Sequence, residues 1–231
     1  MPIHAAAVAV LKPIALSAAL LFGLMSVAGA QTCDYPPSGN PVAYVAPAPG
    51  TKIRYEDVTL RKDTEQTRRE LDYTALNTSA TETEWTIHLA SGQGIAVRTF
   101  LGLMQTVNSS GTSSSFDIEK YARLWPLDGG KTVNFVVTTA AQAGTQYRAA
   151  LSLCVRRFET LSLSAGDFKA VVIDSHSQIV EGGANLPFDE VYTRYWYVPE
   201  YGIYLQRVRA MYMQRREVMK QTRRALSVGG K

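Results

Sequence analysis

The sequence predicts a mainly β fold with little helix, and three observations support that prediction. Many short runs of β-branched and aromatic residues are typical of strands. Clusters of Gly, Pro, Asp and Ser separate these runs about every ten residues. Only one segment, near the C-terminus, has helical character, and it is weak. Together these features favour one antiparallel β domain, built as a curved sheet, a half-barrel or a sandwich.

The first thirty residues have the features of an export signal. Lys12 precedes an apolar run over residues 14–27, and Ala28-Gly29-Ala30 is a small-x-small site of the kind that signal peptidases cut. The run is shorter than the roughly 20 apolar residues of a membrane anchor. The Gln and Thr before Cys33 also break the pattern of a lipid-attachment box. We therefore expect residues 1–30 to be a cleaved signal peptide and the mature protein to be periplasmic.

Residues 31–50 are expected to form a loop, because five prolines exclude a regular helix or a central strand. Cys33 in this segment and Cys154 are the only cysteines, and an even count in an oxidising compartment favours a disulfide. Alternation in the strand that begins at Tyr147 places Cys154 on the more polar face, where the N-terminal segment can lie across it. Such a bond contributes about 4–5 kcal/mol in the chain-entropy model. Two free thiols are the alternative.

The β-rich domain is expected over residues 51–213. In its first half, strands are predicted at 52–61, 68–76 and 84–89, and one or two more lie between 95 and 107. Residues 108–115 are expected to form a polar loop. In the second half, strands are predicted at 131–139, 147–163, 168–174, 191–198 and 203–213, and the weak helix at 215–226.

A short internal similarity suggests two related lobes. Residues 50–55 align with residues 130–135, and each segment opens a strand-rich half of the domain. The lobes would span 51–107 and 121–213. Only six positions align, so independent strand starts of similar composition explain the similarity about as well.

The C-terminal segment, residues 214–231, is expected to be a basic tail. Between Arg207 and Lys231 the chain has eight basic residues and one acid, Glu217. A basic tail can contact anionic lipid peripherally or bind an acidic partner, and a solvated, frayed terminus is the plainer alternative. The net charge of +4 over the whole chain makes no case for nucleic acid binding.

The sequence contains no recognisable catalytic, cofactor or metal motif. The mature chain has two histidines, His88 and His176, and no His/Cys spacing suits a zinc site. HExxH, P-loop and GxSxG motifs are absent from the sequence. The segment Asp174-Ser175-His176-Ser177 places a base near hydroxyls, but neighbours in a strand point to opposite faces. We therefore predict no catalytic residue, no metal ligand and no cofactor.

The densest feature of the chain is aromatic: six Tyr and Trp side chains lie within thirteen residues. Alternation places Tyr195 and Tyr197 on one face and Trp196 on the side of Tyr192. Such rings can line an apolar groove or stack on a sugar, or they can simply fill the core of the domain. The predicted ligand-binding residues are Tyr192, Tyr195, Trp196, Tyr197 and Tyr204.

Three segments of the second half resemble an uncharacterised family. They are residues 125–131 (WPLDGGK), 159–173 (ETLSLSAGDFKAVVI) and 195–205 (YWYVPEYGIYL). Together they are similar to motifs of the domain-of-unknown-function family 3108 over about residues 121–212, with Ser164 in place of the usual proline. The resemblance implies an exported bacterial β-rich protein, akin to the curved half-barrels of lipoprotein carriers. It implies no functional residue, because the family has no assigned activity.

These observations favour a non-catalytic periplasmic protein that binds or carries a lipid-like or glycan component of the cell envelope. A strongly bent sheet must cover its inner face, and this chain has little helix with which to do so. The alternative is a structural or interaction protein of the envelope, which docks on a protein partner through a sheet edge or the basic tail. A hydrolase is the third and weakest hypothesis, since no catalytic constellation is visible.

Overall fold

In the computed structural model of the chain, the structure describes residues 33–89, 92, 94–107, 113–140 and 146–229. The chain divides into two units, Met1–Ala30 and Gln31–Lys231, and the predicted signal peptide lies outside the described residues. Across the described ranges, no helix has the length and apolar character needed to cross a membrane.

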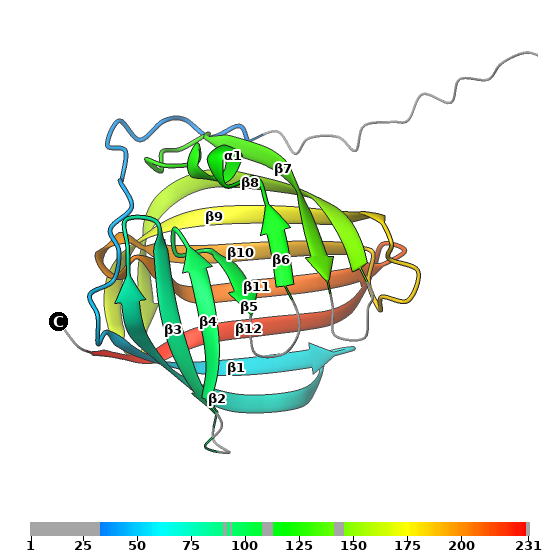
Figure 1. Cartoon of the computed structure of the whole chain (residues 1–231), viewed down its shortest axis with the longest axis horizontal. Coiled ribbons are helices and arrows are strands. Elements are labelled where there is room, and N and C mark those ends of the chain that lie inside the picture. The colour runs from blue at the N-terminus through cyan, green and yellow to red at the C-terminus, as the bar shows by residue number, and fades with distance from the viewer. Residues whose placement is uncertain (1–32, 90–91, 93, 108–112, 141–145, 230–231) are drawn as a thin grey trace, which may run out of the picture. The chain divides into compact units, whose positions relative to one another are not determined.

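The described residues form one antiparallel sheet of twelve strands with almost no helix, which confirms the predicted fold class (Figure 1). The short helices are α1 (Ile118–Ala122) and the 3₁₀ turn η1 (Pro199–Tyr201). The strands are β1 (Lys52–Arg61), β2 (Thr64–Thr78), β3 (Glu82–Leu89), β4 (Gly94–Phe100), β5 (Met104–Val107), β6 (Ser113–Phe116), β7 (Thr132–Ala140), β8 (Gln146–Leu163), β9 (Gly166–Glu181), β10 (Glu190–Val198), β11 (Ile203–Met213) and β12 (Arg216–Gly229).

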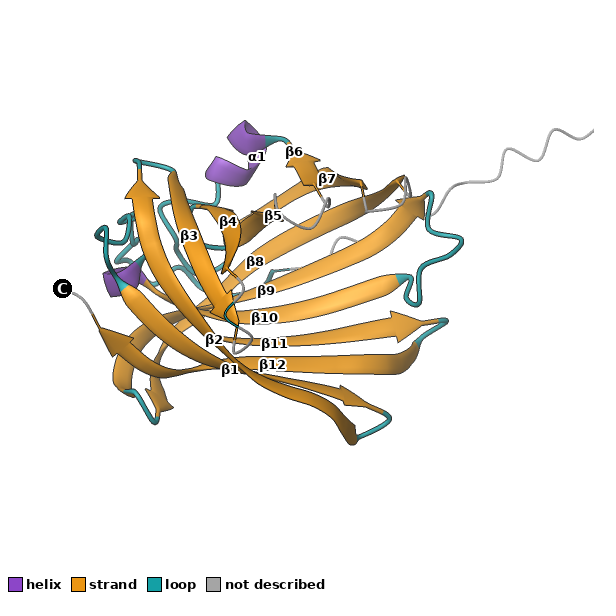
Figure 2. Ribbon diagram, turned by 60° about the horizontal axis from the view of Figure 1, so that its bottom comes forward, coloured by secondary structure: helices purple, strands orange, loops and turns teal. Residues whose placement is uncertain are grey.

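The sheet is a meander that curls until its two edges approach each other (Figure 2). The strand order is β5-β4-β3-β2-β1-β12-β11-β10-β9-β8-β7-β6, so the pairing of β1 with β12 joins the first strand to the last. The edge strands β5 and β6 follow each other in the chain. Phe100 at the end of β4 packs edge-on against Phe116 of β6, with ring centroids 5.5 Å apart, so aromatic side chains bridge the two ends of the sheet.

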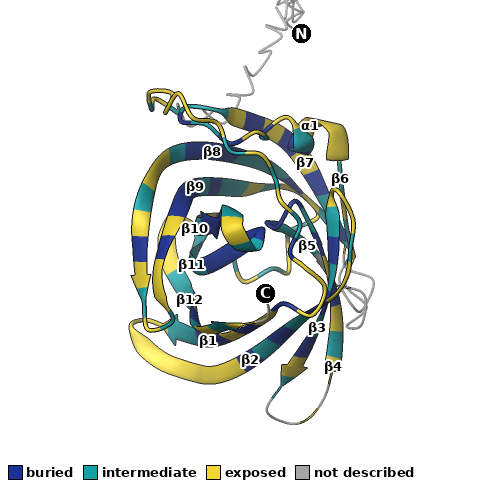
Figure 3. Ribbon diagram, turned by 90° about the vertical axis from the view of Figure 1, so that its left-hand side faces the viewer, coloured by how far each residue is buried: buried dark blue, intermediate teal, exposed yellow. Residues whose placement is uncertain are grey.

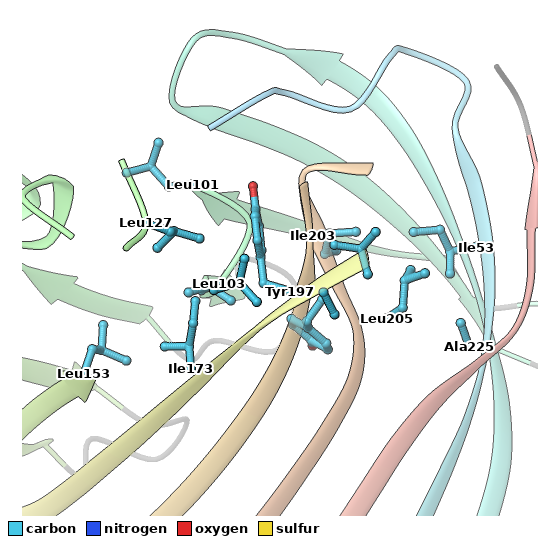
Figure 4. Close-up of a cluster of buried hydrophobic side chains, with 14 of the residues drawn as sticks. Ile53, Leu101, Leu103, Leu127, Leu153, Ile173, Tyr197, Ile203, Leu205 and Ala225 are labelled. Atoms are coloured by element: carbon cyan, nitrogen blue, oxygen red, sulfur yellow. The ribbon is translucent and has the colours of Figure 1, made fainter. Parts of the chain in front are cut away.

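The sheet has an inner, concave face and an outer, convex one (Figure 3). Along β1, Ile53 and Tyr55 are buried inside the curl, whereas Arg54 between them is exposed. The turn of the β10–η1–β11 hairpin lies inside the curl of the sheet (Figure 3), and buried hydrophobic side chains pack around it (Figure 4). Members of this core are Ile53, Leu101, Leu103, Leu127, Leu153, Ile173, Tyr197, Ile203, Leu205 and Ala225 (Figure 4).

Two glycines allow this hairpin to pack closely. Gly202 ends η1 with a left-handed backbone (φ +61°), and a Cβ there would lie 2.1 Å from the carbonyl oxygen of Val45. A Cβ on Gly102, in the turn between β4 and β5, would lie 2.1 Å from the carbonyl oxygen of Gly202. Three chain segments therefore stack at a spacing that only glycine permits.

The N-terminal segment before β1 is fixed across the outside of the sheet. Cys33 is disulfide-bonded to Cys154 of β8, with Cα atoms 5.6 Å apart, as the sequence predicted. Further along, Val42 and Leu127 exchange two backbone hydrogen bonds of 2.8 and 2.7 Å. The Arg156 guanidinium lies 4.8 Å from the centre of the Tyr35 ring. The Pro-rich segment is thus a strap held by covalent, hydrogen-bond and cation–π contacts.

The prediction of a helix at residues 215–226 is wrong: Arg216–Gly229 form strand β12, which pairs with β1 on one side and β11 on the other. Apolar and polar residues do not alternate along this strand, because the inward positions include Gln221 and Arg223. Pairing on both edges overrides the weak local helix preference. The segment expected as a basic tail is therefore mostly a central strand, and the segments 51–107 and 121–213 lie in one continuous sheet that it joins.

The polar loop predicted at 108–115 is also wrong in part. Residues 113–115 belong to β6, where the hydroxyls of Ser114 and Thr139 lie 3.2 Å apart across the pairing with β7. Residues 108–112 lie outside the described part of the chain. Helix α1 was not predicted; the carboxylate of Asp117 caps its N-terminus by accepting a 2.9 Å hydrogen bond from the Lys120 backbone N–H.

Candidate functional site

The concave face of β1, β12 and β11 is polar and charged where a curled sheet would ordinarily continue its core. Strand register places Asp57, Arg223 and Arg207 side by side in one row across the three strands. In the next row, Gln221 pairs with Arg209. We call Asp57, Arg207, Arg209 and Arg223 the arginine cluster.

Arg223 and Asp57 form a buried ion pair at the centre of the cluster. Arg223 is 7% exposed and Asp57 is 2% exposed. Both Nε and Nη2 of Arg223 donate to Oδ2 of Asp57, the former over 3.2 Å. Nη1 donates to the hydroxyls of Tyr73 and, over 3.4 Å, Tyr204. These contacts compensate the loss of water around both charges.

Tyrosine rings surround this ion pair. The Tyr55 ring packs edge-on against Tyr73 with centroids 5.0 Å apart, and Tyr195 lies 5.4 Å from Tyr204. The Tyr55 hydroxyl donates a 2.7 Å hydrogen bond to the Tyr204 carbonyl oxygen. Burial alone would raise the pKa of the Tyr204 phenol, but Arg207 and Arg223 outweigh that effect and hold this pKa below its ordinary value. The rings and guanidiniums are therefore close enough to act as one electrostatic unit.

Arg207 and Arg209 differ from Arg223 because no carboxylate pairs with them. In the described part of the chain, neither guanidinium has an ion-pair partner, and Nε of Arg207 is buried without a hydrogen-bond acceptor. The Arg207 guanidinium lies 5.7 Å from the centre of the Tyr204 ring. Burial, followed by repulsion from Arg207, lowers the pKa of Arg209.

The sequence itself supplies no further side-chain carboxylate. All 20 Asp and Glu residues fall within the described ranges, so no Asp or Glu side chain in another segment of the chain is left to pair with Arg207 or Arg209. The cluster thus brings three guanidiniums together with one carboxylate, Asp57.

An apolar row lies beside the cluster on the side of the β11–β12 turn. Register places Val191, Met211 and Met219 next to one another, two residues further along their strands from the row that contains Arg209. Val191 and Met211 are 5% and 6% exposed, and Met219 is half-buried. The concave face therefore has a cationic patch with aromatic side chains on one side and flexible apolar side chains on the other.

The structure divides the predicted ligand-binding residues between two faces. Tyr197 and Tyr204 are buried and Tyr195 packs against the same core, all on the concave side, with Tyr195 and Tyr204 next to the arginine cluster. Tyr192 and Trp196 lie on the outer face. The alternation predicted for this strand is confirmed, but the five residues do not line one groove.

The two outer residues flank a shallow depression of about 320 Å³ that also contains Arg194 and Asp174. Nε of Arg194 donates to Oδ1 of Asp174 over 2.7 Å. The Tyr192 ring stacks on His176 with centroids 4.4 Å apart. Burial, with the nearby Glu190 carboxylate, raises the pKa of Tyr192 to about 12.

The segment Asp174–Ser177 does not assemble a catalytic triad. Asp174 and His176 are on the outer face, where they pair with Arg194 and Glu190, whereas Ser175 points inward and is 6% exposed. In the described ranges, no group of three or more His, Cys, Asp and Glu side chains is placed to hold a metal ion.

The arginine cluster is not among the sequence-based predictions, although the sequence contains one signal for it. Arg207, Arg209 and Met211 alternate along the predicted strand 203–213 and so share a face. The apolar and aromatic run Ile203–Leu205 before them and Met211 after them indicate a buried setting, which makes the two arginines unusual.

No family model matches the chain, so the resemblance to family 3108 is not confirmed, and no curated protein matches it either. Among solved structures, the chain is similar to an exported protein of YmcC-like fold from Bacteroides fragilis, with a TM-score of 0.50 and 11% identity over 82% of this chain and 100% of that one. This likeness shows the fold.

Two further solved structures have lower scores. The lipoprotein YmcC from Escherichia coli gives a TM-score of 0.48 and 8% identity over 80% of this chain and 87% of that one. A lipoprotein from Parabacteroides distasonis gives a TM-score of 0.44 and 11% identity, over 82% of this chain and 100% of that one.

Proposed function

We propose that this chain is an exported, non-catalytic envelope protein that binds or carries a lipid-like molecule on the concave face of its sheet. The observation that carries the proposal is the pair of arginines on that face, Arg207 and Arg209, which no side chain of the protein neutralises. A half-buried charge without a partner is energetically costly, and groups of this kind are concentrated at binding sites.

The location in the proposal rests on the sequence and on the disulfide. Residues 1–30 have the pattern of a signal peptide, and the Cys33–Cys154 bond is of a kind that persists outside the reducing cytoplasm. The exported protein of similar fold from Bacteroides fragilis agrees with an extracytoplasmic position.

Native mass spectrometry tests the proposal. The protein is isolated from the periplasm without denaturation, and its mass is compared with that of the denatured chain. We expect an adduct of lipid mass on a chain that begins at Gln31 and is lighter by two hydrogens because of its disulfide. A bare protein that remains bare after incubation with an extract of envelope lipids would overturn the carrier function.

A glycan ligand is the second candidate, and the outer depression favours it. Tyr192 and Trp196 flank a space that also holds the Arg194–Asp174 pair, and aromatic rings beside polar groups suit the faces and hydroxyls of sugars. The same spectrum separates the two candidates by the mass of the adduct. Docking through a sheet edge or the basic C-terminal segment stays a prediction.

A further inference from the structure

We propose that the ligand of the concave face is an anionic amphiphile, an acyl chain with a carboxylate or phosphate head, and that Arg207 and Arg209 bind its head group. This inference rests on the proposed function, because it specifies the ligand of the same site.

The charges of the site require an anion. Asp57 is the one carboxylate of the arginine cluster, and Arg223 binds it through two nitrogens. Arg207 and Arg209 therefore face each other's positive charge, and burial lowers the pKa of Arg209. A neutral ligand would remove further water from both guanidiniums without replacing its hydrogen bonds. An anionic head group supplies the missing acceptors.

The positions of the two arginines suit a small oxyanion. They are two residues apart on one face of β11, so their Cα atoms are separated by about 7 Å, a span that guanidiniums on flexible stems can close around one head group. Nε of Arg207 has no acceptor among the described residues, so this guanidinium retains unused hydrogen-bonding capacity for a head group. Tyr195 lies opposite Arg207 in the register of β10 and β11.

The neighbouring apolar row explains why the ligand has a chain. Val191, Met211 and Met219 follow the arginines toward the β11–β12 turn, on the same face. Unbranched methionine side chains adapt to apolar ligands of varied shape. A head group at the arginines would leave its acyl chain against this row. A free inorganic anion would contact only the arginines and not the apolar row.

The test measures binding of four probes to the mature, disulfide-bonded protein after bound lipid has been removed. The probes are palmitate, palmitoyl lysophosphatidate, the neutral monopalmitoylglycerol and inorganic phosphate, and affinities come from calorimetry below the micellar concentrations. The variants are Arg207→Gln and Arg209→Gln. Arg216→Gln is the matched control, since Arg216 is an exposed arginine of β12 with the same change of charge.

We expect one or both anionic amphiphiles to bind at least about tenfold more tightly than the neutral one, the preferred head distinguishing carboxylate from phosphate. Each cluster variant should weaken that binding by about tenfold to hundredfold, whereas the control should not. If the neutral amphiphile bound as tightly as the anionic ones, and the variants did not change these affinities, the inference would be overturned. The carrier function would still stand. Phosphate binding as tight as that of the amphiphiles would overturn the role of the chain. Failure of every amphiphile would overturn both proposals.

A second measurement distinguishes binding from a structural role. Replacing Arg209 with Met removes an unpaired charge from a half-buried position, so thermal unfolding of the ligand-free Arg209→Met protein should occur at an equal or higher temperature than in the parent. The stabilisation that palmitate or lysophosphatidate gives to the parent should be lost. A lower unfolding temperature without ligand would show that Arg209 supports the fold instead.

Discussion

Replacing Asp57 with Asn should destabilise the protein strongly, because it removes the one carboxylate of the arginine cluster. Asn keeps the shape of Asp but leaves Arg223, which is 7% exposed, without its anion. Breaking a buried ion pair by removing one partner costs about 3–5 kcal/mol. We expect the upper end of this range, because Asp57 also lies near two other arginines. Arg207 is in the same row, and Nη2 of Arg69 is 3.7 Å from Asp57.

Urea unfolding followed by circular dichroism measures this cost, and a thermal scan should show a midpoint lower by on the order of 10 °C. Glu56→Gln is the matched control, because Glu56 is the neighbouring acid on the opposite face. It pairs with Arg68 and Arg224, whose side chains are 51% and 53% exposed, so its loss should cost about 0–1 kcal/mol. A cost for Asp57→Asn within about 1 kcal/mol of the control would refute the reasoning.

A double variant separates the free energy that the Asp57–Arg223 ion pair contributes from the cost of leaving one of its charges buried without a partner. Asp57→Leu together with Arg223→Met removes both charges, and exchanging a buried pair for apolar residues is often neutral or stabilising by about 1–4 kcal/mol. We therefore expect the double variant to be clearly more stable than Asp57→Asn. A double variant as unstable as the single one would show that the hydrogen bonds of Arg223, rather than its charge balance, hold the strands together.

Three further predictions concern the hairpin, the strap and the outer depression. Gly202→Ala should lower the free energy of unfolding by more than about 1 kcal/mol, because Gly202 has a positive φ and a close backbone contact. Gly50 also has a positive φ but open space around its Cβ position, so Gly50→Ala should cost less in the same urea titration. Replacing Cys33 and Cys154 by Ser should cost about 4–5 kcal/mol under oxidising conditions, and an unchanged midpoint would contradict the strap's role. Trp196→Ala should leave amphiphile binding intact, and a tenfold loss in calorimetry would place the ligand on the outer face.

The sequence predicts the features that depend on residues close together in the chain. Strands such as 203–213 and the faces of Cys154 and Tyr195 follow from alternation, which each strand carries in its own residues. The disulfide followed from the cysteine count and the face on which Cys154 lies. The closure of the sheet did not follow, because it depends on pairing between β1 and β12, whose residues Asp57 and Arg223 are 166 positions apart. No local pattern reports such a contact.

The helix wrongly predicted at 215–226 and the missed site have one cause. Strand β12 lacks alternation because its inward residues Gln221 and Arg223 are polar, and they are polar because they lie in or beside the arginine cluster. A strand that served only the core would carry apolar residues at those positions and would have been recognised. Local rules fail where a protein keeps residues that its fold does not need, which is itself an argument for function there. The concave face of β11 and β12 is therefore the first place to test for the proposed ligand.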